Sequence, residues 1–104
     1  MKLKPVTLAD LTVTTSGTEV RVTTDTTILP VKIIFSGKAT NTGHVLVGDS
    51  NVATTRGFTI AAGASVVLDA DNYRGGGCAF QLSDFYVDAV TNGDIVKVTY
   101  FTRT

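Results

Sequence analysis

The chain has 104 residues, the size of a single domain, and its nine basic and nine acidic side chains give a formal net charge of zero. Proteins that bind nucleic acid or anionic membranes usually carry an excess of positive charge, so neither is expected as a partner. Charged residues make up 17% of the chain and hydrophobic residues 43%, which favours an assembled or particle-bound protein over a crowded cytosolic monomer.

The cysteine content and the absence of targeting segments indicate where the protein is made. Cys78 is the single cysteine, so the chain has no intrachain disulfide. The first residues lack the apolar core and the cleavage site of a signal peptide, and no apolar run is long enough to span a bilayer. We expect a soluble protein that is assembled in a reducing cytoplasm.

Residues 1–10 are expected to form a short N-terminal arm that is frayed or ordered by a neighbouring molecule. The arm carries Lys2 and Lys4, and Pro5 blocks a helix there. Residues 11–104 are expected to form one domain.

The first two predicted strands cover residues 11–15 and 19–24, which are rich in β-branched side chains. Ser16-Gly17 lies between them and predicts a β-hairpin turn. Val20 and Val22 would face the core because side chains alternate along a strand.

Two central strands follow. In the first, Val31, Ile33 and Phe35 alternate with outward residues, of which Ile34 is apolar. The second covers residues 45–47, where Leu46 is apolar between two valines. A strand that is apolar on both faces is expected to be buried twice, by a second sheet or by another subunit.

Short strands at residues 58–60 and 66–68 come next, and a glycine-rich stretch follows them at residues 69–77. A strand over residues 85–89 leads to Asn92-Gly93, which predicts a hairpin turn into residues 95–102. About eight short strands with no helix predict an all-β fold, either an antiparallel sandwich or a barrel. Of the two we favour the antiparallel β-sandwich, with a jelly-roll-like arrangement.

One set of turn and strand motifs runs over residues 28–100. It consists of Asn41-Thr42-Gly43, the turn Val47-Gly48-Asp49-Ser50-Asn51-Val52, Gly57, Ala62-Gly63-Ala64-Ser65 and the segment Leu82-Ser83-Asp84-Phe85-Tyr86-Val87. This set resembles a pattern found in small β-rich virion proteins of tailed bacteriophages. Ala62-Gly63 replaces the common Pro-Gly, and residues 73–79 look like an insertion.

The resemblance implies a non-enzymatic accessory virion protein that decorates or cements a capsid, with a homotrimer as the favoured assembly. Its partners would be the major capsid protein or other virion proteins, and its location the virion. A neck, tail or baseplate component is an alternative. A carbohydrate-binding β-sandwich is another, although the chain has no Trp to form a sugar platform.

Candidate chemistry is sparse, and neither a catalytic site nor a cofactor is expected. His44 is the single histidine and no Gly-x-Ser-x-Gly elbow is present, so a turn or strand-entry role is favoured. Cys78 has no second cysteine or nearby histidine, which disfavours a nucleophile or a metal ligand.

Two further stretches have a possible binding role. Oxygen ligands for calcium could come from Asp69, Asp71 and Asn72 with Asp49, but their spacing does not match a calcium loop, so no metal site is predicted. The glycine triplet at residues 75–77 lacks the Lys-Ser/Thr of a phosphate-binding loop.

Four residues are predicted to contact a partner protein. Tyr73 and Arg74, beside the glycine triplet, belong to the residue types enriched in interface hot spots. Lys2 and Lys4 on the N-terminal arm would bridge to neighbouring capsid subunits. The competing interpretation of the loop is a solvated segment with no partner.

Overall fold

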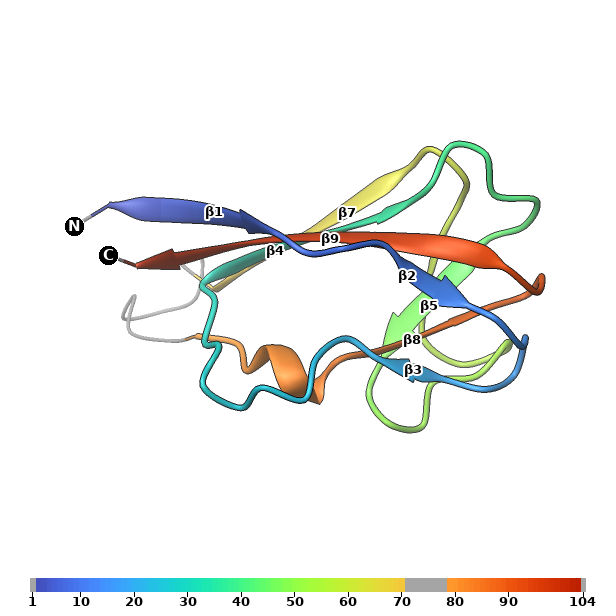
Figure 1. The fold of residues 1–104 in the computed structure, drawn as a ribbon, viewed down its shortest axis with the longest axis horizontal. Helices are drawn as coiled ribbons and strands as arrows, with labels where there is room; N and C mark the ends of the chain where they lie inside the picture. The colour runs from blue at the N-terminus through green and yellow to red at the C-terminus, as the bar shows by residue number, and fades with distance from the viewer. Residues whose placement is uncertain (1, 71–78, 104) are drawn as a thin grey trace.

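Short strands make up nearly all of the regular structure (Figure 1), and the computed structural model describes residues 2–70 and 79–103. The strands are β1 (Leu3–Thr7), β2 (Leu11–Val13), β3 (Val20–Arg21), β4 (Lys32–Gly37), β5 (Val45–Gly48), β6 (Phe58–Ile60), β7 (Ser65–Asp69), β8 (Tyr86–Ala89) and β9 (Asp94–Arg103). One 3-10 turn, Leu82–Asp84, precedes β8. In the described part of the chain, no helix is long and apolar enough to cross a membrane.

The strands form two antiparallel sheets that pack face to face. Sheet A has the order β1-β9-β4-β7, and β2 continues along the same edge of β9 as β1. Sheet B has the order β3-β8-β5-β6. With β1 and β2 counted as one interrupted strand, each sheet has four positions in the order of a jelly roll. The predicted antiparallel β-sandwich is confirmed.

The core lies between the sheets and is built by the predicted alternation. Val31, Ile33 and Phe35 are fully buried, and the Phe35 ring lies 6.2 Å from that of Phe58 and 5.5 Å from that of Phe85. Aromatic pairs at these centroid distances pack favourably. Leu46, on the opposite face of β5 from the core valines, is only 2% exposed within a single chain. Its burial therefore needs no second subunit.

The expected N-terminal arm is wrong for residues 3–7, which form β1 and pair along β9 from Leu3 opposite Arg103 to Thr7 opposite Thr99. Pro5 is compatible with this edge strand. Its partner Phe101 directs its backbone oxygen toward β4, where it accepts a hydrogen bond from the backbone N–H of Val31 at 2.9 Å. The N–H that Pro5 lacks would have faced solvent, so no ladder bond is lost.

Both predicted hairpins are also wrong, because each turn joins one sheet to the other. Ser16-Gly17 connects β2 in sheet A with β3 in sheet B, and Asn92-Gly93 connects β8 in sheet B with β9 in sheet A. The turns lie side by side: the Ser16 N–H donates to Asn92 Oδ1, and the Gly93 N–H donates to the Val13 oxygen, both at 2.7 Å. Turn residues specify a chain reversal but not the sheet that receives the next strand.

Candidate functional site

An open depression of about 380 Å³ lies on the side of sheet B that faces away from the core. It is the first of two surface features in the described residues that are candidates for binding. Its lining comes from β3, the turn after β5, the 3-10 turn and β8. The lining residues are Arg21, Asp49, Ser50, Ser83, Asp84 and Tyr86.

Arg21 is fixed in this depression by two neighbours. Its Nε donates to the backbone oxygen of Ser83 at 2.8 Å, and its guanidinium carbon lies 5.6 Å from the centre of the Tyr86 ring. A guanidinium at this distance from a ring is attracted to its π-electrons. The guanidinium therefore lies over one face of the Tyr86 ring.

The depression contains two carboxylates but no metal-binding cluster among the described residues. Its two carboxylates, Asp49 and Asp84, have no third ligand, and the described residues contain no group of three or more His, Cys, Asp or Glu placed to hold a metal ion. His44 is exposed at the entry to β5 and does not line the depression. Of the calcium candidates, Asp49 follows β5 in sheet B, whereas Asp69 ends β7 in sheet A. Asp71 and Asn72 lie outside the described residues.

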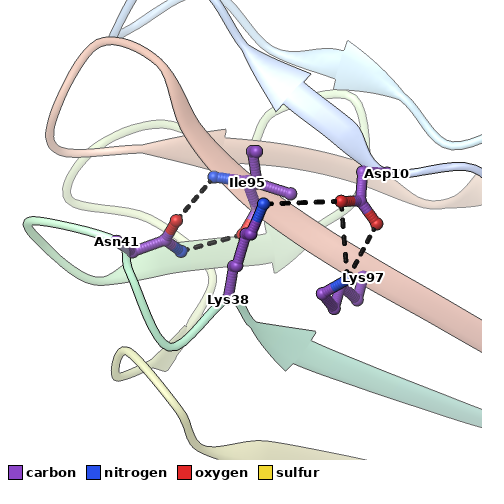
Figure 2. A network of polar contacts seen from close by, with 5 residues as sticks. All are labelled: Asp10, Lys38, Asn41, Ile95 and Lys97. Atoms are coloured by element: carbon purple, nitrogen blue, oxygen red, sulfur yellow. Dashed lines mark hydrogen bonds and ion pairs between the residues drawn. The ribbon is translucent and has the colours of Figure 1, made fainter.

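The Asn41-Thr42-Gly43 motif is hydrogen-bonded to the start of β9, and Figure 2 shows the part of this contact that joins Asn41 to Ile95. The Asn41 side chain exchanges two hydrogen bonds with the backbone of Ile95, each 2.8 Å long. The Asp94 carboxylate, on a residue that is 5% exposed, accepts hydrogen bonds from the N–H groups of Thr42 at 3.0 Å and Gly43 at 2.9 Å. The Asn41 side chain and the N–H groups of Thr42 and Gly43 are thus used to hold the start of β9.

Asp88 is a buried polar residue that sequence reasoning missed. Alternation along β8 places its side chain on the face of the strand that points away from the core, yet the residue is fully buried. Its Oδ1 accepts hydrogen bonds from the N–H groups of Gly17 at 3.0 Å and Ala89 at 2.8 Å, while Oδ2 has no partner among the described residues. No signal in the sequence marks this burial, because it depends on where the Ser16-Gly17 turn packs.

The second surface feature is the outer face of sheet A, where each of the four strands β1, β9, β4 and β7 contributes an apolar side chain and polar residues such as Thr99 and Lys32 lie between them. Cross-strand pairing places Pro5 opposite Phe101 and Ile34 opposite Val67, all pointing away from the core. We call these four residues, together with Leu3, the sheet A surface. Leu3 is 43% exposed and Val67 is 51% exposed. Lys32 Nζ lies 5.6 Å from the centre of the Phe101 ring.

The predicted partner-contact residues are only partly placed by the structure. Lys4 is exposed on β1, but its side chain is on the other face of that strand from Leu3 and Pro5. Lys2 immediately precedes β1. Tyr73 and Arg74 lie outside the described residues. The sheet A surface itself was not predicted, although the apolar outward Ile34 was a signal for it.

Comparisons with protein-family models, with curated proteins and with solved structures found no match. The functional proposal is therefore based on the residues themselves. In the depression, Arg21 is already in contact with Ser83 and Tyr86. On the sheet A surface, Leu3 and Val67 are exposed to solvent.

Proposed function

We propose that this chain is a non-enzymatic structural protein of a bacteriophage virion, and specifically a capsid decoration protein that stabilises the head. The observation that carries the proposal is the sheet A surface, in which Leu3, Pro5 and Val67 are exposed and Ile34 and Phe101 are half-buried, on a protein with zero net charge and few charged residues. Contiguous exposed apolar side chains typically mark a protein-binding surface.

The sequence resemblance supports the same proposal. It spans residues 28–100 and includes the Asn41-Thr42-Gly43 motif, whose side chain and backbone groups are used to hold β9. The resemblance implies that the chain assembles as a homo-oligomer, with a trimer as the expected number. On a capsid, many copies that each make modest contacts would resist internal pressure through avidity.

Two other functions are alternatives to capsid decoration. A neck, tail or baseplate component would use the same kind of surface at a different position in the particle. A carbohydrate-binding module would need an open aromatic face, and in the depression one face of the Tyr86 ring is covered by Arg21. Glycan-array binding would favour that module.

The proposal is tested by mixing the purified protein with isolated heads of the phage that encodes it. Co-sedimentation and cryo-EM should show regular occupancy on expanded heads, and heads with bound protein should resist heat better than bare heads. Density at the neck or tail in intact particles would instead support the alternative location. Failure to bind any part of the particle would contradict the proposal.

A matched pair of variants tests whether the sheet A surface is used. Ile34→Lys places a charge on the outer face of sheet A, and Thr59→Lys places one on an exposed position of β6 in sheet B. We expect Ile34→Lys to lower occupancy on heads at least tenfold and Thr59→Lys to leave it unchanged. Equal occupancy for both variants would exclude the sheet A surface as the contact.

A further inference from the structure

The two edges of sheet A differ in how well they are protected against pairing with another strand. Edge strands expose unpaired backbone N–H and C=O groups, and proteins commonly block them with lysine, proline or bulges. The β1 edge contains Pro5 and Lys4 within the strand. It is also interrupted at residues 8–10, which lie between β1 and β2 and belong to neither strand. The β7 edge, Ser65–Asp69, has the sequence SVVLD and contains none of these features.

The hydrogen bonds between β4 and β7 show which backbone N–H and C=O groups of β7 are not bonded to β4. Ala64 accepts a hydrogen bond from the Gly37 N–H at 3.0 Å, and the Ala70 N–H donates to the Val31 oxygen at 2.7 Å, so even-numbered residues bond toward β4. The backbone groups of Ser65 and Val67 therefore point away from β4, since direction alternates along a strand. These backbone groups have no partner among the described residues.

We propose that β7 pairs antiparallel with β7 of a second copy, around a two-fold axis at Val67. In this register Val67 faces Val67 of the other copy, Val66 faces Leu68, and Ser65 faces Asp69. Apolar side chains thus face apolar ones and the acidic residue faces a polar one, so no like charges oppose each other. The net charge of zero adds no long-range repulsion between copies.

The other edge strand of sheet A, β1, is a less suitable partner for β7 than a second β7. Thr7 and Val67 lie at opposite ends of one row across sheet A, Thr7–Thr99–Ile34–Val67. A head-to-tail contact would bring β7 against β1, where Pro5 offers no N–H to the incoming strand. A self-complementary β7 pair closes after two copies and joins the two apolar sheet A surfaces into one.

A single five-residue strand pair buries little area, so the association is expected to be weak and dependent on concentration. On its own it yields a dimer, whereas the resemblance implies a trimer. Sedimentation velocity should show reversible dimerisation of the full chain as its concentration rises from about 10 µM to 1 mM. Val67→Lys and Val67→Pro should abolish the shift toward dimer. Thr7→Lys, at the other end of the same row, should leave it intact.

Cross-linking tests the register in a Cys78→Ser background. Val67→Cys would place two cysteines opposite each other with Cα atoms about 5.5 Å apart, within the range of a disulfide. Ser65→Cys would place its two cysteines about 14 Å apart along the strands, too far to cross-link. We expect oxidation to convert the Val67→Cys protein to covalent dimer at least tenfold faster than the Ser65→Cys protein.

The outcomes separate this inference from the proposed function. Equal cross-linking rates for the two cysteine variants, a dimer that survives Val67→Lys in folded protein, or a strict monomer or trimer at high concentration would overturn β7 self-pairing. Circular dichroism of each variant establishes that it is folded. Binding to heads is measured independently, so a β7 dimer that ignores heads would support this inference and contradict capsid decoration.

Discussion

The side-chain amide of Asn41 pairs with the backbone of Ile95 in the way that a neighbouring strand would. Its Nδ2 donates to the Ile95 oxygen and its Oδ1 accepts from the Ile95 N–H, both at 2.8 Å (Figure 2). One side chain thus extends the hydrogen bonding of β9 to a loop 54 residues away in the sequence. The loop before β5 is held to sheet A by this contact.

Removing the two hydrogen bonds between Asn41 and Ile95 should lower the free energy of unfolding. Asn41→Ala leaves two part-buried backbone groups of Ile95 without their partner, so we expect a loss of about 1–3 kcal/mol in the free energy of unfolding. Asn41→Asp keeps the acceptor for the Ile95 N–H but places a carboxylate oxygen against the Ile95 oxygen, so it should not restore the lost stability. Urea denaturation measures the difference, with Asn51→Ala at an exposed turn as the control. Equal stability of Asn41→Ala and the parent would show that the two hydrogen bonds contribute nothing net.

Two glycines with positive φ should respond differently to alanine. Gly57 has φ of +125°, and a Cβ there would lie 2.8 Å from the Val47 oxygen, whereas Gly17 has φ of +87° with nothing within 4 Å of a Cβ. Gly17→Ala should cost about 1 kcal/mol from backbone conformation alone. Gly57→Ala should cost about 3 kcal/mol or more, because it adds the clash with backbone. Thermal unfolding compares them, and a larger loss for Gly17→Ala would contradict the geometry.

Asp25 should titrate below its ordinary value of 3.8. Its pKa is lowered first by a hydrogen bond from the Thr27 hydroxyl and second by one from the Thr27 N–H. A depressed folded-state pKa contributes stability that is present above the unfolded value and lost as the pH falls through the folded one. Thr27→Val should raise the Asp25 pKa toward 3.8 in a carboxyl NMR titration. An unchanged midpoint would show that the hydroxyl does not lower the Asp25 pKa.

The ion pairs of Asp10 should contribute little. Asp10 lies 3.1 Å from Lys97 and 4.0 Å from Lys38, and all three side chains are more than a third exposed (Figure 2). Exposed pairs of this kind contribute about 0.2–1 kcal/mol, so Asp10→Ala should lower the free energy of unfolding by no more than that. The difference should shrink further in about 1 M salt, where charges are screened. A loss that persists at high salt would point to a packing role instead.

The sequence predicted the sandwich and much of its core because alternation and turn residues are local signals. Phe35 and Val47 face the core as expected. The partners of each strand were harder to predict, because Ser16-Gly17 and Asn92-Gly93 reverse the chain equally well within one sheet or between two. The N-terminal error had a similar origin: Pro5 excludes a helix and a central strand, but it is compatible with an edge strand.

The sheet A surface was also only partly predictable, because local sequence signals do not specify which strands pair. Ile34 was recognised as an apolar residue on an outer face, but its neighbours Val67 and Phe101 come from segments far away in the sequence. Only the register of β4 with β7 and β9 brings them together. Lys2 and Lys4 were chosen for an arm, and the arm is in fact a strand at residues 3–7. Their contact with a partner stays a prediction.

The position of β9 in the centre of sheet A has a consequence for folding during synthesis. β9 pairs with β1, β2 and β4, and the ribosome makes it after all three. Leu3 must find a partner 100 positions later in the chain, at Arg103. Until β9 emerges, β1 and β2 have no strand to pair with, and β4 can pair only with β7. The nascent chain therefore exposes unpaired strands until β9 has been made, and folding should be slow because its contacts are long-range.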